Sequence, residues 1–184
     1  MSDASTPRSH VVTIDGLRFG YHVAGRGPAC VVHPGGPGIH WPYLRMPDLE
    51  REMTMVYLAP VGTGESDLLP DGNYSVERYA YFADQVIQQL GDAKVYFLGH
   101  SHGGFVALQL ALDQPEQLAE WQRTVDLTVD PKRRPDLRDV RDRLAEVDVP
   151  TLVVGEPEKF VKTVTDFVAL RQATTTANNH GGAA

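Results

Sequence analysis

Short apolar runs separated by turn residues recur along this chain, and amphipathic segments lie between several of them. Runs of four to seven residues bounded by Gly, Pro or Asp are typical of buried strands. They predict strands at His10–Ile14, Arg18–Val23, Cys30–His33, Met55–Ala59, Lys94–Leu98 and Thr151–Val154. Strands that alternate with helices predict an α/β fold, with a mainly parallel sheet and flanking helices.

The strongest helical pattern begins after Tyr74. Ser75 is a good N-cap residue, and Gly91 is placed to end the helix. Apolar residues between them recur at helical spacing: Tyr79, Phe82, Val86, Ile87 and Leu90. A charged helix is predicted over 136–147 and an amphipathic one over 160–170.

The pentapeptide from Gly99 to Gly103 has the form G-x-S-x-G and lies between a predicted strand and a predicted helix. In this context the pattern predicts a nucleophile elbow, a turn so sharp that small residues are needed on both sides of the serine. The turn would strain the backbone of Ser101 and expose its hydroxyl at a helix N-terminus. An ordinary glycine-rich loop is the alternative, and the flanking strand and helix argue against it.

A second glycine-rich loop, residues 33–38, follows the strand at Cys30–His33. An acyl-transfer serine needs two N–H donors aimed at the developing oxyanion, one of them from the residue after the nucleophile. The sequence therefore predicts an oxyanion hole formed by the amides of His102 and Gly36, with Gly35 as the alternative donor. His33 and His40 bracket this loop and are predicted to line the substrate entrance.

Together these motifs resemble the α/β-hydrolase family, and more narrowly its proline-iminopeptidase-like branch. The residues that carry the resemblance are Pro34-Gly35-Gly36-Pro37-Gly38, the segment from Tyr57 to Asp67, and the elbow. The resemblance covers about 11–118 and returns at about 148–170. It implies a serine hydrolase of esters or small peptides, with antiparallel first strands in the sheet and no cofactor.

The resemblance also shows what this chain lacks. Family triads run Ser, then Asp or Glu, then His along the chain, yet Gly155 leads directly into Glu156, where the acid loop, the last strand and the histidine loop are expected. A core strand and most of a lid are also expected to be missing after Glu120, which leaves about 119–147 as a lid remnant. Glu156 and His180 are weak substitutes for the acid and the base.

Composition and charge bear on the number of domains, the binding partners and the cellular compartment. A chain of 184 residues predicts one domain, 1–172, followed by a flexible tail, 173–184. A net charge of −7 argues against nucleic-acid binding. The single cysteine, Cys30, fits a buried thiol in a reducing cytoplasm, and no apolar window is long enough for a membrane span. No metal site is predicted.

Three functions remain open from the sequence. The first is a serine hydrolase impaired by the missing acid and base, since a serine hydroxyl needs a base to become a good nucleophile. The second is a catalytically inactive hydrolase scaffold, truncated or engineered, that acts as a binding module. The third is an interaction protein that self-associates or binds a partner chain through an open sheet edge.

Overall fold

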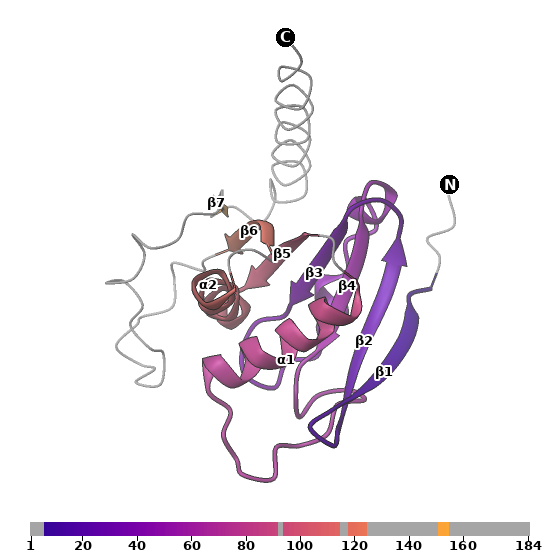
Figure 1. Ribbon diagram of the computed structural model, residues 1–184. Coiled ribbons are helices and arrows are strands. Elements are labelled where there is room, and N and C mark those ends of the chain that lie inside the picture. The colour runs from indigo at the N-terminus through magenta and orange to yellow at the C-terminus, as the bar shows by residue number, and fades with distance from the viewer. Residues whose placement is uncertain (1–5, 92–93, 115–117, 125–150, 155–184) are drawn as a thin grey trace.

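The computed structural model describes residues 6–91, 94–114, 118–124 and 151–154. Its strands form one sheet in the order β1-β2-β4-β3-β5-β6-β7 (Figure 1). The strands are β1 Arg8–Ile14, β2 Leu17–Gly25, β3 Ala29–His33, β4 Thr54–Ala59, β5 Val95–His100, β6 Leu118–Thr124 and β7 Thr151–Val154. The helices are α1 Val76–Gln89 and α2 His102–Asp113, with short 3-10 turns η1 Trp41–Leu44 and η2 Leu49–Arg51.

The direction of the strands changes across the sheet. β1 pairs with β2, and β2 with β4, in antiparallel fashion. Every other pairing in the described sheet, from β4 through β3, β5 and β6 to β7, is parallel. The predicted α/β fold, with a mainly parallel sheet and antiparallel first strands, is therefore confirmed. The six predicted strands are all present, with ends that differ by a few residues.

The expectation of a missing core strand after Glu120 is wrong. Leu118–Thr124 forms β6, which lies between β5 and β7 in the sheet. Gln122 is paired with Leu98 on one side and with Leu152 on the other. A strand inside a parallel sheet cannot be omitted without leaving backbone N–H and C=O groups unpaired. The start of the predicted lid remnant is therefore sheet, and β7 does not pair directly with β5.

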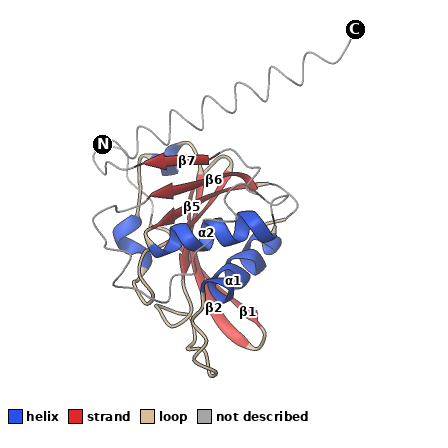
Figure 2. Cartoon of the chain, turned by 90° about the vertical axis from the view of Figure 1, so that its left-hand side faces the viewer, coloured by secondary structure: helices blue, strands red, loops and turns tan. Residues whose placement is uncertain are grey.

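The sheet is buried on both faces, because alternate residues of its central strands enter two different apolar clusters. Val31, Val56 and Phe97 pack on the face covered by the helices. Their neighbours Cys30 and Tyr57 pack on the opposite face, with residues of η1 and η2. Figure 2 shows α1 and α2 together on their side of the sheet. Cys30 is 3% exposed, which confirms the prediction of a buried thiol.

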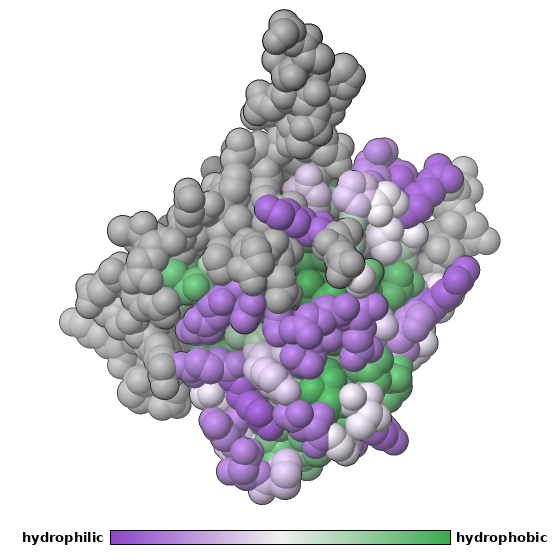
Figure 3. All heavy atoms as spheres, viewed as in Figure 1, coloured by the Kyte–Doolittle hydropathy of each residue, from purple (hydrophilic) through white to green (hydrophobic). Residues whose placement is uncertain are grey.

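Helix α1 forms as the sequence predicts. The Ser75 hydroxyl accepts a hydrogen bond from the Arg78 N–H, and Gly91 adopts φ +100° just beyond the helix. The Ser75 hydroxyl satisfies a backbone N–H at the N-terminus of the helix, and Gly91 ends the helix. Its apolar side joins the core, and hydrophilic residues dominate the described surface over α1 (Figure 3).

Neither α1 nor α2 has the length and apolar character that a bilayer span requires, and this holds for all described helices. The predicted helices over 136–147 and 160–170, the tail 173–184, Glu156 and His180 lie outside the described residues.

Candidate active site

Ser101 stands at the turn between β5 and α2. Its backbone has φ 51° and ψ −113°, a conformation that residues with a Cβ rarely adopt. Holding such a conformation costs of order 1–3 kcal/mol, so the surrounding structure must enforce it. Its side chain makes no capping hydrogen bond to α2, which leaves the hydroxyl available for other chemistry. The predicted strain at Ser101 is therefore present.

At both elbow glycines the neighbouring backbone leaves no room for a side chain. A Cβ on Gly99 would lie 2.1 Å from the Gly103 carbonyl oxygen, and a Cβ on Gly103 would lie 2.3 Å from the His33 carbonyl oxygen. Both distances are far below van der Waals contact. The close approach of β3, β5 and α2 at this point therefore depends on both glycines, and it holds the turn that strains Ser101.

The loop after β3 lies directly against the elbow. A Cβ built on Gly35 would come within 3.0 Å of the Ser101 Cβ. Gly36 adopts φ 51°, and its carbonyl accepts a hydrogen bond from the Ile39 N–H. The glycine-rich loop and the first turn of α2 thus converge at Ser101. The first N–H groups of a helix have no partner within the helix, and its dipole favours negative charge there.

The prediction of Gly35 as the alternative oxyanion donor is wrong. Its N–H donates to the Tyr43 hydroxyl at 2.7 Å and so is engaged within the loop. The same hydroxyl lies 2.8 Å from His100 Nδ1. Burial raises the pKa of Tyr43, although the hydrogen bond from Gly35 works against the rise. Tyr43 is therefore a neutral phenol at neutral pH and links the oxyanion loop to the elbow.

His33 is part of the core and not of an open entrance. It is 2% exposed, and its Nδ1 lies 2.9 Å from the Pro34 carbonyl oxygen, to which it donates. Burial lowers the pKa of its imidazole to about 3, with a smaller contribution from His102. The predicted role of His33 at the substrate entrance is therefore wrong, because the side chain is neutral and sealed from solvent.

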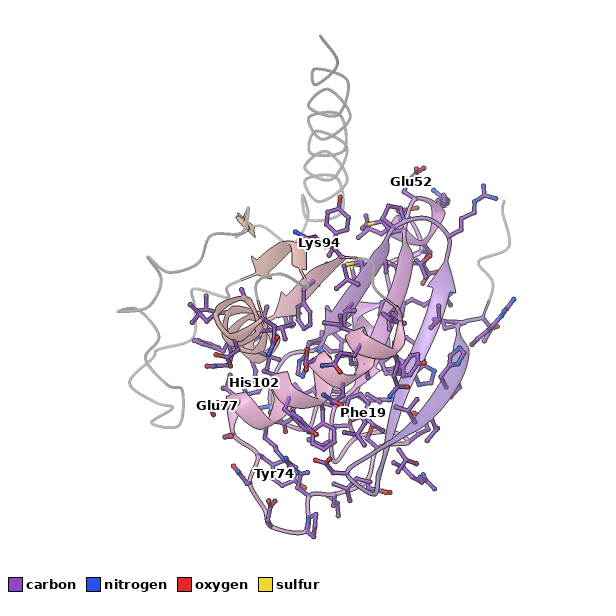
Figure 4. The ribbon with its side chains drawn as sticks, viewed as in Figure 1. Phe19, Glu52, Tyr74, Glu77, Lys94 and His102 are labelled. Atoms are coloured by element: carbon purple, nitrogen blue, oxygen red, sulfur yellow. The ribbon has the colours of Figure 1, made fainter. Side chains whose placement is uncertain are left out.

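His102 follows Ser101, and its side chain turns toward helix α1. It is 6% exposed and makes an edge-on contact with the Tyr79 ring, with centroids 5.1 Å apart. In Figure 4 it lies between the start of α2 and helix α1. This position leaves its backbone amide at the elbow while its ring belongs to the core.

His40 lies on the surface of the loop between Gly36 and η1. Its side chain is exposed, and its ring meets Trp41 edge-on at 5.9 Å. Its predicted place at the substrate entrance stays a prediction, since nothing in the described residues fixes where a substrate lies.

Tyr43 is the site residue that sequence reasoning missed. It follows Gly35 by eight residues and lies within η1, in the stretch Trp41-Pro42-Tyr43-Leu44. An aromatic residue in such a segment is typical of apolar packing, and no local spacing indicates that its hydroxyl returns to the loop. Only the folded loop brings the phenol to Gly35 and His100.

The described residues thus bring together two features that an acyl-transfer site requires. A strained serine and a glycine-rich loop are in place, which suits nucleophilic attack and oxyanion stabilisation. The segments in which the resemblance places an acid and a base fall beyond Gly155, outside the described residues.

Comparison with known proteins agrees with this geometry. The chain is 34% identical over 117 residues to RutD of Caulobacter vibrioides, a protein provisionally named a carbamate hydrolase; the match covers 61% of this chain and 43% of RutD. The structure of Cfl2 from Burkholderia cenocepacia superposes with a TM-score of 0.59 at 26% identity, over 70% of this chain and 46% of Cfl2.

Epoxide hydrolase VrEH1 from Vigna radiata shares the fold, with a TM-score of 0.61 at 22% identity over 76% of this chain and 46% of VrEH1. The chain therefore spans less than half the length of each of these three relatives.

Residues 28–120 match the family described as the alpha/beta hydrolase fold, a range that includes the oxyanion loop, the elbow and both described helices. This match covers half of the chain, and it contains every residue placed above at the candidate site. The chain belongs to the α/β-hydrolase family.

Proposed function

We propose that the protein is a serine hydrolase that cleaves esters, and small peptides far more slowly, through Ser101. The observation that carries this proposal is the strained backbone of Ser101, with φ 51°, beside the loop of Gly35 and Gly36. Small peptides enter as a second substrate class through the resemblance to the proline-iminopeptidase-like branch. The single cysteine supports a reducing compartment such as the cytoplasm.

The chemistry follows from the groups in place. The Ser101 hydroxyl attacks the ester carbonyl as its proton passes to water, and the amides of Gly36 and His102 stabilise the oxyanion of the tetrahedral intermediate. Departure of the alcohol leaves an acyl ester on Ser101, which water then hydrolyses to release the acid and regenerate the serine. Enzymes of this kind that lack their triad partners keep roughly 10³–10⁴-fold of rate enhancement over water. An alcohol leaves readily from the intermediate, whereas an amine needs a general acid. Slow and ester-selective hydrolysis is the expected activity.

The test is hydrolysis of p-nitrophenyl acetate by the purified full chain and by Ser101→Ala. Ser9→Ala serves as the matched control, because Ser9 is an exposed residue of β1. We expect Ser101→Ala to lose the protein-dependent rate and Ser9→Ala to keep it. Equal rates for the wild type and a folded Ser101→Ala variant would show that Ser101 is not the nucleophile, and would favour an inactive scaffold.

A second candidate function, self-association, rests on the edge of the sheet. β7 is the outermost described strand on its side, and β6 is its only partner among the described strands. An edge strand exposes N–H and C=O groups that can pair with another copy of the chain. Sedimentation analysis of the wild type and Val153→Pro tests this idea. A wild-type monomer at high concentration would contradict it.

A further inference from the structure

Three polar side chains from distant parts of the chain meet near the loop that follows β3. His22 lies on β2, His40 precedes η1, and Glu65 follows β4. One ligand atom from each, two imidazole nitrogens and one carboxylate oxygen, lies within 4.8 Å of the other two. We propose that these residues form a binding site for a divalent transition metal ion, with Zn²⁺ as its best-matched occupant.

The donor set selects this class of metal. Two imidazoles and one carboxylate suit Zn²⁺, whereas Mg²⁺ and Ca²⁺ prefer all-oxygen sites. His22 Nε2 and Glu65 Oε2 are 3.1 Å apart. Two ligands in a tetrahedral zinc site are about 3.3 Å apart, given metal–ligand bonds of about 2.0–2.1 Å. This pair therefore already has the required separation, and three protein ligands leave a fourth position for water.

The fold holds Glu65 over His22. The loop after β4 turns back onto the start of β2, where the Gly20 N–H donates to the Ser66 hydroxyl at 2.8 Å. The Ser66 hydroxyl in turn donates to the Ala59 carbonyl. These bonds anchor the loop next to Glu65, whose carboxylate contacts His22 in the absence of an ion.

Two glycines leave the space that the ligands occupy. A Cβ on Gly64 would lie 2.7 Å from His40 Nε2, and a Cβ on Gly20 would lie 3.1 Å from Glu65 Oε2. Gly64 also adopts φ 51°. A hydrogen bond between His22 and Glu65 accounts for two of the three residues. It does not account for the approach of His40 or for the room that Gly64 leaves for its ring.

The Trp41 ring packs against the imidazoles of both His22 and His40. Its ring lies 4.5 Å from that of His22 and 5.9 Å from that of His40, between centroids, and it is 7% exposed. His22 has a side chain only 10% exposed, whereas that of Glu65 is 38% exposed. The site is therefore buried on the side of His22 and open to solvent on the side of Glu65 and the exposed His40, through which an ion can enter.

Calorimetric titration of the full chain with Zn²⁺ tests the proposal, and Co²⁺ absorption reports the coordination geometry. We expect one ion per chain, and affinity at least about tenfold weaker in His40→Ala and in Glu65→Gln, since the loss of even an outer-shell partner costs about 10–100-fold. His10→Ala is the matched control, because His10 is an exposed histidine of β1, and it should bind as the wild type does. Zn²⁺ should also raise the melting temperature of the wild type, because it binds the folded state.

His40→Ala decides the outcome, because His40 is exposed and its loss should not disturb folding. Unchanged Zn²⁺ affinity in both His40→Ala and Glu65→Gln would overturn the proposal. Equal weakening in a control variant would show binding spread over surface histidines, and would overturn it as well. None of these readouts depends on Ser101, so the result is independent of the proposed hydrolase activity.

Discussion

The Tyr43 hydroxyl lies 2.8 Å from His100 Nδ1, and this contact joins the loop after β3 to the residue that precedes Ser101. The same hydroxyl accepts the Gly35 N–H, so one phenol fixes both sides of the candidate site. A loop that must present an amide to an oxyanion works best when it is already held in place. Within the proposed hydrolase function, we expect Tyr43 to act as a positioning residue.

Replacing Tyr43 with Phe should slow ester hydrolysis without unfolding the protein. The variant removes the hydroxyl that contacts both the Gly35 N–H and His100 Nδ1, and a loss of about 1 kcal/mol of loop ordering corresponds to roughly a fivefold lower kcat. Tyr43 is 50% exposed, so the melting temperature should barely change. Steady-state kinetics with p-nitrophenyl acetate measure the effect. Tyr81→Phe is the control, because the Tyr81 hydroxyl donates a hydrogen bond to the exposed side chain of Asp15. Equal kcat losses in both variants would contradict a positioning role for Tyr43.

Replacing Ser101 with Gly should stabilise the fold while removing the proposed nucleophile. Glycine adopts φ 51° freely, so the variant releases backbone strain of about 1–3 kcal/mol. The greater freedom of glycine in the unfolded chain offsets about 0.4–1 kcal/mol of this. We expect the free energy of unfolding in urea to rise by about 1 kcal/mol. Ser101→Ala keeps the Cβ and should show no such gain; a Gly variant less stable than the Ala variant would rule out strain at this turn.

Replacing Gly103 with Ala should destabilise the protein through a steric clash. The new Cβ would lie 2.3 Å from the His33 carbonyl oxygen, and backbone cannot move aside easily. We expect a loss of about 3 kcal/mol in urea unfolding, at the upper end of the range for overpacking. Gly16→Ala is the comparison, since its Cβ meets nothing within 4 Å and only the left-handed φ of +78° is strained. That variant should lose about 1 kcal/mol. Similar losses in the two variants would mean that the elbow is less tightly packed than described.

Stability should fall as the pH falls from about 6.5, because of His33. Its pKa is lowered from 6.5 to about 3 by burial, so the unfolded chain binds a proton in this range that the folded chain does not. One such group contributes a slope of about 1.4 kcal/mol per pH unit, or about 2 kcal/mol between pH 6.5 and 5. Urea unfolding at several pH values measures the slope. His33→Asn keeps a donor for the Pro34 carbonyl and should flatten it; an unchanged slope would show that other groups dominate.

The elements with local signals were predictable from the sequence. Ser75, Gly91 and the apolar positions between them define α1, and the elbow pentapeptide defines the strained turn at Ser101. β6 was not recognised because its sequence, Leu-Ala-Glu-Trp-Gln-Arg-Thr, lacks the continuous aliphatic run of a buried parallel strand. Its place is fixed by pairing with two other strands, and such long-range pairing leaves no local pattern.

The roles of individual side chains at the site were harder to predict. His33 and Gly35 lie in the loop that the sequence indicated, yet one is buried in the core and the other donates to Tyr43. Motif spacing places the backbone of such a loop near the nucleophile. The direction of each side chain and amide depends on contacts with residues such as Tyr79 and Tyr43, which are distant in the chain.

The position of β3 in the sheet determines when, during synthesis of the chain, this strand can gain both of its neighbours. β3 lies between β4 and β5, so its second neighbour emerges from the ribosome only after the residues from Val95 onward have been made. Until then the glycine-rich loop has no elbow to rest against, and Tyr43 has no His100 to meet. A nascent chain arrested before Val95 would expose one edge of its central strand to chaperones and to other chains. The two halves of the candidate site can therefore meet only after β5 has been made.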